Sequence, residues 1–371
     1  MTLAKAGLTR RHVLAGAALA LRPLDALAQP ASPIGKPAMP PQIRVATPQD
    51  VPAIAELLLE DARQRAALDP VLWRVAADAR ARLNKAIGAA FDASRAALPP
   101  EFWLVAEHAG RMLGIAHAVI VPVPPIYNGE AGSPGLLLDD CFISADAPSG
   151  TSDQLLAATE AALKTAGAAR LIASCPAAGP LRPLYERKGY EPVTLYMAKH
   201  RLRSSARTSA ARPATAADIP GIVERSAEHR RTLASINPRF WHIHPEADHR
   251  FEAWMRRSLT LKDRDMLVAA DVDRIRGYVI AQPISPLLVP AAHDAAAIGV
   301  IDDFYDEDFA NVSTFSHGGR SGEGLLAAAE TAFARRRVDS ALVVCPAGWT
   351  SKIALLEGMN YRTAKLWMLK R

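Results

Sequence analysis

The sequence predicts an α/β protein built from two copies of one mixed α/β unit. Its 371 residues are too many for one ordinary core and fit two domains of common size. Hydrophobic residues make up 50% of the chain and charged residues 22%, which is typical of a globular protein rather than a disordered one. The third observation is that the same short motifs occur twice along the chain in the same order.

The duplication extends from the first predicted strand to the C-terminus. The motifs recur at spacings of 163 to 170 residues, and only the loop lengths between them change. We therefore expect two halves of ordinary domain size, 42–201 and 211–371, joined by a linker at 202–210. The matched residues are Arg44, Thr47, Asp50, Pro52, Asp139, Asp140, Cys175 and Pro176 in the N-terminal half, and Arg212, Thr215, Asp218, Pro220, Asp302, Asp303, Cys345 and Pro346 in the C-terminal half.

Each half shows the same succession of strands and helices. Asp50 and Asp218 stand directly before apolar residues at helical spacing, which indicates the start of a helix. Apolar runs on both sides of Gly114 and of Gly277 predict antiparallel hairpins. A long helix rich in Ala and Leu follows each Asp pair. The expected elements of the two halves are β-runs at 42–46 and 211–214, hairpins at 103–107 with 113–123 and at 266–270 with 276–282, long helices at 152–166 and 322–336, β-runs at 170–174 and 340–344, and last strands at 194–199 and 364–369.

The first 41 residues are expected to lie outside this duplicated fold. Residues 1–28 contain a basic start with the pair Arg10-Arg11, a short apolar stretch and a small-x-small site that ends at Ala28, which is the layout of a twin-arginine-like export signal. Residues 29–41 are rich in Pro and predict an extended linker. The prediction is therefore a periplasmic protein. The alternatives are a cytoplasmic protein with an amphipathic N-terminal helix, or a wrongly chosen start codon.

Charge and composition exclude several classes of function. The formal net charge is +6, but residues 1–28 carry +3 of it, so the rest of the chain is only weakly basic and gives little support to nucleic-acid binding. No apolar run reaches the roughly 18–20 residues that span a bilayer, so no integral membrane span is expected. Three cysteines are too few for a disulfide-built scaffold. No metal is expected, because the histidines near Trp241 have no counterpart in the N-terminal half and no Cys joins them.

The order of these elements, with their residues, resembles the GNAT acyltransferase superfamily. The resemblance covers both halves, about nine-tenths of the chain. It implies two tandem GNAT-like domains, each an α+β sandwich with a mixed, mostly antiparallel sheet flanked by helices. It also implies an acyl-CoA-dependent N-acyltransferase that moves an acetyl group from acetyl-CoA, or another acyl-CoA, to a small-molecule amine. The motifs that carry it are the opening Arg-x-Ala-Thr-x-x-Asp-hydrophobic-Pro, the strands at 138–143 and 301–305, and the helix-turn segments at 184–190 and 355–361.

The resemblance places the cofactor in the C-terminal half. Family members bind the pyrophosphate on a Gly-rich loop that opens the long helix, where unpaired N–H groups and the helix dipole attract phosphate. The N-terminal counterpart, 149–154, lacks both motif glycines and contains Asp153. The simpler alternative is a flexible Gly-rich loop before a helix. The expected cofactor-binding residues are Gly319, Arg320, Ser321, Gly322, Glu323 and Gly324.

The resemblance also suggests the catalytic groups. The family often uses a carboxylate on the fourth strand as the base, and a Tyr in the late helix as the acid. The matching residues are Asp302, Asp303 and Asp140 for the base and Tyr185 for the acid. Because adjacent residues on a strand face opposite sides, we expect one Asp of each pair to face the cleft. The same acids could instead be caps, ion-pair partners or substrate-binding groups.

A second function of another class stays open. The Tyr and the Gly-rich loop lie in different halves, since Leu356 stands where the C-terminal half would have its Tyr. The alternative is therefore a non-catalytic, exported GNAT-like protein that binds a small ligand or a protein partner. Export favours that alternative, whereas the intact Gly322-x-Gly324 favours the enzyme.

Overall fold

The computed structural model describes residues 40–92, 99–127, 132–203, 211–272 and 274–371. The predicted export signal and nearly all of the Pro-rich linker lie outside the described residues. The chain from Pro40 to Arg371 forms one compact unit. No helix among the described residues is both long and apolar enough to cross a membrane.

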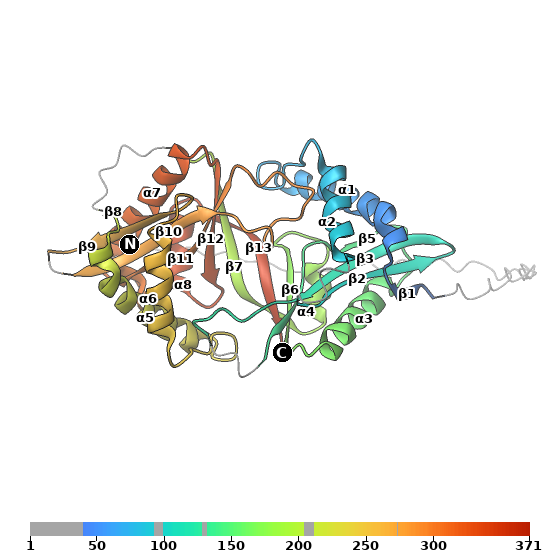
Figure 1. Ribbon diagram of the computed structural model, residues 1–371, viewed down its shortest axis with the longest axis horizontal. Helices are drawn as coiled ribbons and strands as arrows, with labels where there is room; N and C mark the ends of the chain where they lie inside the picture. Colours follow the sequence, from blue (N-terminus) through green and yellow to red (C-terminus); the bar gives the residue numbers. More distant parts are fainter. Residues whose placement is uncertain (1–39, 93–98, 128–131, 204–210, 273) are drawn as a thin grey trace, which may run out of the picture. The chain divides into compact units, whose positions relative to one another are not determined.

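The strands form one continuous, mixed sheet (Figure 1). In each half, the outer strands pair in antiparallel fashion and are followed by one parallel pair. This pair is β4 with β6 in the N-terminal half and β11 with β12 in the C-terminal half. Along the sheet, the strands are β1 (Gln42–Val45), β2 (Glu101–His108), β3 (Arg111–Ile120), β4 (Pro134–Leu137), β6 (Arg170–Pro176), β13 (Arg362–Lys370), β7 (Tyr190–His200), β12 (Ser340–Pro346), β11 (Ile298–Asp306), β10 (Ile275–Pro283), β9 (Asp265–Ala270) and β8 (Arg212–Pro213), and the short β5 (Phe142–Ile143) pairs with β3.

The centre of the sheet is shared between the two halves. Strand β13, which ends the C-terminal half, lies between β6 and β7 of the N-terminal half. Strand β7, which ends the N-terminal half, pairs in turn with β12 of the C-terminal half. The last strand of each half thus contributes to the sheet of the other. Because β7 and β13 are antiparallel neighbours, the two halves are related by an approximate twofold axis between them (Figure 1).

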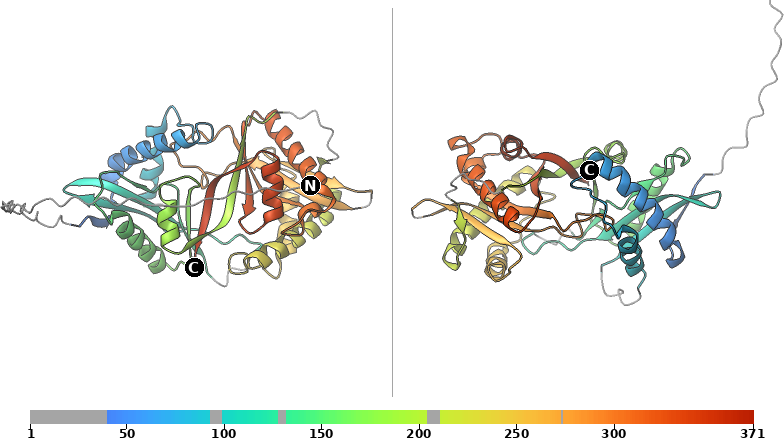
Figure 2. Two further views of the ribbon diagram at one scale, coloured as in Figure 1. Left: turned by 180° about the vertical axis from the view of Figure 1, so that it is seen from behind. Right: turned by 90° about the horizontal axis from the view of Figure 1, so that it is seen from above.

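Helices cover both faces of the sheet. On β3, Gly114 faces Leu155 of α3, whereas the next residue, Ile115, packs among residues of α1 on the other face. Figure 1 labels both α1 and α3, and Figure 2 shows the blue α1 and the green α3 from behind. The described helices are α1 (Val51–Leu68), α2 (Ala79–Ala90), α3 (Thr151–Thr165), α4 (Arg182–Arg187), α5 (Ile219–Ile236), α6 (Ala247–Ser258), α7 (Arg320–Arg335) and α8 (Thr350–Gly358), with short 3-10 turns at Pro48–Asp50, Ala216–Asp218, Glu307–Phe309 and His317–Gly319.

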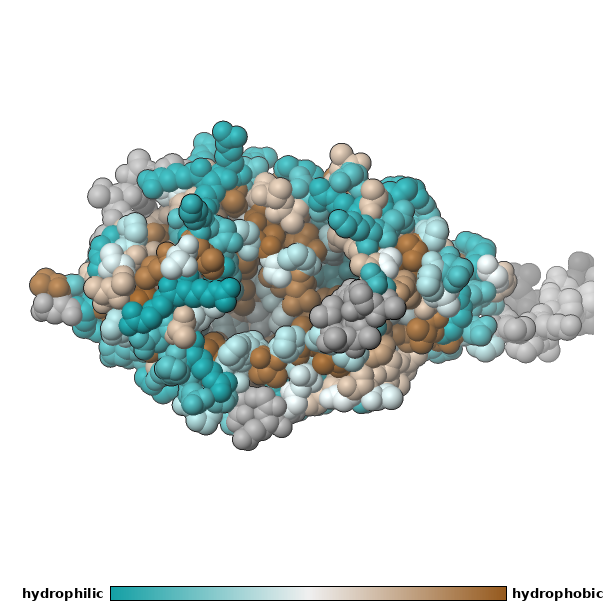
Figure 3. Space-filling view, in the orientation of Figure 1, coloured by the Kyte–Doolittle hydropathy of each residue, from teal (hydrophilic) through white to brown (hydrophobic). Residues whose placement is uncertain are grey.

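The predicted fold class is confirmed: a mostly antiparallel α/β sheet is flanked by helices, and the expected strands and long helices are present in both halves. The halves differ at the Asp pairs. In the C-terminal half, β11 runs through Asp302 and Asp303 with one bulge opposite Ile280 and Ala281. In the N-terminal half the strand is interrupted between β4 and β5, where the Cys141 N–H donates to the Asp139 carbonyl at 2.8 Å. Figure 3 shows that the face seen in Figure 1 is hollowed near its middle.

Candidate functional site

A cleft opens in the N-terminal half where two strands separate. The parallel pairing of β4 with β6 ends at Leu137 and Ala173, and the chain then turns away to pair with β3 as β5. The gap holds a cavity of about 230 Å³, which we call the N-terminal cleft. Helices α1, α3 and α4 close its sides. Its lining includes Asp61, Arg65, Cys141, Ser152, Ser174 and Arg187.

Helix α1 places an ion pair on the wall of this cleft. Asp61 and Arg65 lie four residues apart on one face of the helix, with the carboxylate 2.6 Å from Arg65 Nε. Burial raises the pKa of Asp61 to about 6, although the charge of Arg65 opposes that rise. A carboxylate with this pKa is ionised at neutral pH and still basic enough to accept a proton from a substrate.

The first Asp pair lies behind that wall. Asp139 forms ion pairs with Arg65, at 3.7 Å, and with Lys365 of β13. Asp140 lies 3.1 Å from His117 Nδ1. Burial alone would raise the pKa of Asp140, but the interaction with His117 outweighs burial, so this pKa is lowered. The other ring nitrogen of His117 lies 3.0 Å from Glu101. Asp140 therefore has a partner, and the described residues that line the N-terminal cleft include Asp61 rather than either member of the pair.

Tyr185 lies on α4 beside the cleft. It is buried and, together with Cys141, lines a smaller hollow of about 20 Å³ next to the main cavity. Burial raises the pKa of its hydroxyl well above the ordinary value, so the group keeps its proton at neutral pH. This position suits a proton donor, and the predicted role of Tyr185 as the acid stays a prediction.

The two thiols in the cleft are poor nucleophiles. Cys141 and Cys175 both line the cavity, and burial raises the pKa of each thiol to about 12. Since the thiolate is the reactive form, these groups are nearly all protonated near neutral pH. They serve here as small buried side chains that leave the cleft open.

The first turn of α3 borders the cleft with basic groups close by. Ser152 and the exposed Arg187 both line the cavity. Asp153 forms an ion pair with Lys188 at 2.6 Å, so its negative charge is compensated. A helix N-terminus with a nearby guanidinium is an arrangement that attracts phosphate.

The corresponding region of the C-terminal half is filled by side chains. Phe304 stands where the N-terminal half has Cys141, and it packs with Phe309 at 5.0 Å between ring centres. Trp349 packs on Phe309 and donates from its indole N–H to the Phe309 carbonyl at 2.8 Å. Lys352 donates to the Phe304 carbonyl at 2.7 Å. All four side chains are fully buried, so the space between β11 and β12 is occupied by the protein itself.

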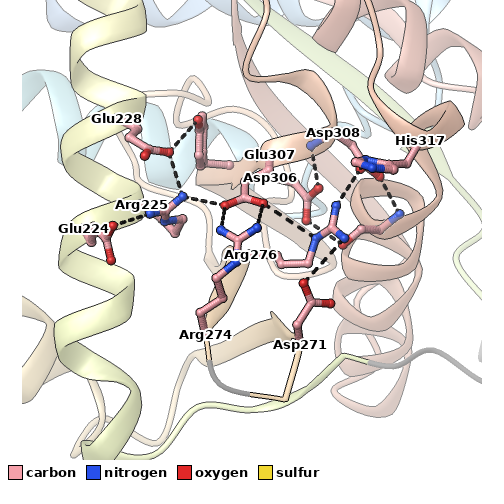
Figure 4. A network of polar contacts seen from close by, with 12 residues as sticks. Glu224, Arg225, Glu228, Asp271, Arg274, Arg276, Asp306, Glu307, Asp308 and His317 are labelled. Carbon is pink, nitrogen blue, oxygen red and sulfur yellow. Dashed lines mark hydrogen bonds and ion pairs between the residues drawn. The ribbon is translucent and has the colours of Figure 1, made fainter.

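The six residues predicted to bind the cofactor, 319–324, form the start of α7, where a carboxylate of the chain already lies. The Ser321 N–H donates to Asp308 at 2.7 Å, and the Ser321 hydroxyl donates to Asp306 at the same distance. Arg276 lies 3.1 Å from Asp308 and compensates its charge (Figure 4). A Cβ on Gly322 would lie 3.0 Å from Leu355 and Phe309, so close packing also accounts for this glycine. Cofactor binding at these residues stays a prediction.

The second Asp pair points to other groups. Asp303 lies 3.1 Å from His229 Nδ1 and accepts from the Tyr278 hydroxyl at 2.6 Å. Asp302 is the extra residue of the bulge and accepts from Gln282 at 2.7 Å. Asp302 reaches solvent, but the protein around it, followed by the charge of Asp303, raises its pKa to about 7. No group of three or more His, Cys, Asp or Glu suited to a metal occurs among the described residues.

Comparison with known proteins shows the fold but gives no close relative. No protein family and no curated protein matches the chain. A GCN5-related glucosamine N-acetyltransferase region of a fungal multi-domain β-N-acetylglucosaminidase superposes with a TM-score of 0.52 and 12% identity over 90% of this chain. A GCN5-related N-acetyltransferase from Sphaerobacter thermophilus gives a TM-score of 0.50 and 17% identity over 89% of this chain and 94% of the other. The chain has the GNAT fold. It spans only 38% of the length of the fungal protein.

The sequence pointed to the Asp pairs and Tyr185, whose roles stay predictions, but it did not reveal the polar wall of the N-terminal cleft. Asp61 and Arg65 are charged residues on the buried side of α1, on either side of the core residue Ala62. That pattern, at a spacing of four residues, is the signal that could have revealed them. Lys365 could not be found this way, because only the exchange of strands brings it to the other half.

Proposed function

We propose that the protein is an acyl-CoA-dependent N-acyltransferase and that acyl-CoA, most simply acetyl-CoA, binds in the N-terminal cleft. One observation carries the proposal: within a GNAT fold, the strands β5 and β6 separate around an open cavity in the N-terminal half, whereas aromatic side chains fill the corresponding space in the C-terminal half. The cofactor site that the sequence suggests, at 319–324, is the competing location.

In the proposed reaction Asp61 is the base and Tyr185 is the acid. The acceptor enters as an ammonium ion and loses one proton to Asp61. The freed amine attacks the thioester carbonyl carbon, so that a C–N bond forms and the C–S bond breaks. Tyr185 gives its proton to the CoA thiolate and regains one from the nitrogen as the amide forms. One proton then leaves Asp61 for solvent, which balances the reaction.

Two charge reversals locate the cofactor. Arg187 borders the N-terminal cleft and Arg320 opens α7, and both side chains are exposed, so neither change should disturb the core. We expect Arg187→Glu to weaken acetyl-CoA binding by about tenfold or more, because charged hydrogen bonds to phosphate are lost and repulsion is added. Arg320→Glu should leave the dissociation constant unchanged. Isothermal titration calorimetry of the two variants beside the wild type makes the comparison.

The competing results are equally clear. If only Arg320→Glu weakens binding, the cofactor lies in the C-terminal half and the proposed location is wrong. If the wild type binds no acyl-CoA, the enzyme is excluded. The alternative, a non-catalytic binding protein, is favoured by the filled C-terminal space and by the missing glycines at 149–154. It would be supported by acetyl-CoA binding without amide formation for any amine in a broad panel.

Export to the periplasm is a separate part of the proposal. Its support is the order of charges, apolar residues and small residues in 1–28. N-terminal sequencing of the protein recovered from its own cells should give Gln29 as the first residue. A chain that still begins at Met1 or Thr2 would show that the signal is not cleaved.

A further inference from the structure

We propose that the C-terminal half of the chain takes part in the chemistry of the N-terminal cleft through Lys365. This lysine is a positioning residue that acts through Asp139 and Arg65 on Asp61, the carboxylate on the cavity wall. The role of Asp61 as the base rests on the proposed function, whereas the coupling of these four residues can be measured without acyl-CoA.

The four residues form one chain of charges of alternating sign. The Asp61 carboxylate lies 2.6 Å from Arg65 Nε. Arg65 Nη2 donates to the Asp139 main-chain carbonyl, and Nη1 lies 3.7 Å from one oxygen of the Asp139 carboxylate. The other oxygen of that carboxylate forms an ion pair with Lys365. The contacts therefore lead without a gap from β13 of the C-terminal half to the wall of the N-terminal cleft.

Asp139 depends on these two cations for its charge balance. Its side chain is 3% exposed, that of Arg65 4% and that of Lys365 0%, so water screens these charges only weakly. Arg65 and Lys365 are the cations in contact with Asp139 in the part of the chain that the structure describes. With Lys365 in place, Asp139 is compensated without a hydrogen bond from Nη1, and Arg65 keeps its Nε on Asp61.

Loss of the lysine charge would leave both carboxylates to Arg65. Its Nη1 needs to move by less than about 1 Å to hydrogen-bond with Asp139, so the guanidinium would be drawn toward that carboxylate. After burial, the pKa of Asp61 is set by Arg65, which lowers it, and by Asp140 and Asp139, which raise it. A weaker hold of Arg65 and an uncompensated Asp139 act in the same direction, and Asp61 would keep its proton to a higher pH.

The C-terminal half fixes the position of the lysine. Lys365 Nζ donates to the carbonyl of Leu288, in the segment between β10 and β11, at 2.8 Å. The same nitrogen lies 5.6 Å from the centre of the Tyr196 ring on β7. A carbonyl oxygen and the face of an aromatic ring both attract a cation. Lys365 is therefore held at this point as a charged group.

The second copy of the fold lacks this chain of charges. The residues that match the four, at the spacings of the repeat, are His229 for Asp61, Leu233 for Arg65, Asp302 for Asp139 and Thr194 for Lys365. Only the aspartate is kept, and there it accepts from Gln282 at 2.7 Å and forms no ion pair with any described residue. The arrangement is thus confined to the half with the open cavity, as expected for groups that serve the cavity rather than the shared fold.

Other titratable groups reach this region from the remaining elements. Asp140, which also acts on Asp61, lies in an ion pair with His117 of β3. His293, between β10 and β11, has a pKa lowered to about 4, first by burial and then by the charge of Arg65, so it is neutral near pH 7. Arg187 of α4 lines the cavity and is exposed to solvent. The thiols that line the cavity and stay protonated are Cys141 and Cys175.

Two substitutions with opposite expected effects test the coupling. The quantity measured is the midpoint of Asp61, the pH at which its carboxyl is half ionised. Lys365→Met removes the charge at similar side-chain length and should raise the midpoint by at least about half a pH unit. Asp139→Asn removes a negative charge that acts on Asp61 and should lower the midpoint by a similar amount. Because the active form of Asp61 is ionised, the fall in the rate of acyl transfer should move with the midpoint.

A double variant and a matched lysine complete the comparison. Lys365→Met combined with Asp139→Asn removes both members of the ion pair and should return the midpoint to within about 0.3 pH units of the wild type. Lys370→Met, on the same strand, removes an ion pair with Glu160 of the N-terminal half and should leave the midpoint unchanged. A role of Lys365 in folding alone would lower stability, but it would not move the midpoint in opposite directions in the two single variants.

Two methods measure the midpoint in the full chain. Carbon-13 NMR of protein labelled at the aspartate carboxyl carbons needs no substrate, and the signal of Asp61 is the one that is lost in Asp61→Asn. Rates of CoA release against pH at low substrate report the same group in the working enzyme. Thermal unfolding checks that each variant is folded. If Lys365→Met does not fold, Asp139→Asn and the double variant decide.

The outcomes separate the coupling from the proposed function. A midpoint that stays at the wild-type value in Lys365→Met or in Asp139→Asn, or that the double variant does not restore, overturns the coupling even if acetyl-CoA is bound and used. The expected shifts in a protein that acetylates no amine support the coupling and contradict the enzyme. The expected shifts by NMR, beside a pH–rate profile that does not follow them, support the coupling and remove Asp61 as the base.

Discussion

Asp61 sets the expected pH dependence at the scale of single residues. Its pKa is raised to about 6, first by burial, and its basic form is the ionised one. The rate of acyl transfer at low substrate should therefore be level above pH 7 and fall about tenfold per unit below pH 6. Asp61→Asn should lower the rate by about 100-fold or more and remove the acidic limb of the pH–rate profile, that is, the fall in rate below pH 6. Rates of CoA release at pH 5 to 8 measure both effects. A limb near pH 7 that disappears in Asp302→Asn would instead assign the base to Asp302.

Cys141 provides a second prediction at this scale. Its thiol lines the cleft, but burial holds its pKa at about 12, so hardly any thiolate is present near neutral pH. We expect Cys141→Ala to keep acyl transfer within about threefold of the wild type, because no acyl-enzyme forms on sulfur. Mass spectrometry of the wild type after rapid quenching should show no added acetyl group. Detection of an acetylated Cys141 would show that the acetyl group is transferred through a covalent acyl-enzyme rather than directly to the amine.

How much of the site the sequence reveals depends on the residue. Tyr185 and the Asp pairs could be proposed as site residues because they stand at family positions and, for the Asp pairs, recur in the second half. The sequence could not show which carboxylate reaches the cavity. The strand breaks between β4 and β5, so side chains there no longer alternate simply between the two faces of the sheet. The side chains that close the C-terminal space, such as Trp349 and Phe309, are equally hidden until the chain is folded.

At the scale of elements, the turn before the first helix of each half is built twice in the same way. The Asp218 carboxylate accepts from the Thr215 N–H at 2.7 Å and from Arg212 at 2.8 Å. Asp50 repeats these bonds with Thr47 and Arg44, both at 2.7 Å. The arginine bonds, opposed by partial burial, lower the pKa of both carboxyls. This repeated capping is the physical reason why the starts of both helices were predictable.

The two caps should therefore contribute equally to stability. Asp50→Asn and Asp218→Asn should each lower the free energy of unfolding by about 1 kcal/mol, the usual value of a cap. Because both pKa values are depressed, this contribution is present above the pKa of the unfolded carboxyl and is lost as the pH falls through the lower folded value. Urea unfolding at pH 7 and pH 3 measures it. Asp78→Asn, in an exposed ion pair with Arg82, is the control and should cost little. Equal losses in all three variants would contradict the role of the caps.

At the scale of the whole molecule, the repeat predicted two halves but not how they are joined. The spacing of motifs shows that the last strand occurs in each copy, yet it does not say beside which strand it lies. Pairing β13 with β6 or with a strand of its own half uses the same backbone bonds and similar side chains. The choice depends on long-range contacts, such as Lys370 with Glu160 and Lys199 with Glu330, which local patterns do not contain.

The exchange of strands leads to a prediction for the intact fold. A protease site inserted within 204–210 allows the chain to be cut between the halves after folding. Each fragment would then hold a strand that pairs with strands of the other, β13 between β6 and β7, and β7 beside β12. We expect the cut fragments to co-elute as one particle and to unfold in a single transition, because separation would break all of these pairings and expose the central core. Size-exclusion chromatography and calorimetry before and after cutting measure this. Two outcomes would contradict this prediction: two separate elution peaks, or two unfolding transitions of which one is also seen for the isolated fragment. Either outcome would mean that the halves are independent domains and that the shared centre of the sheet contributes little to holding them together.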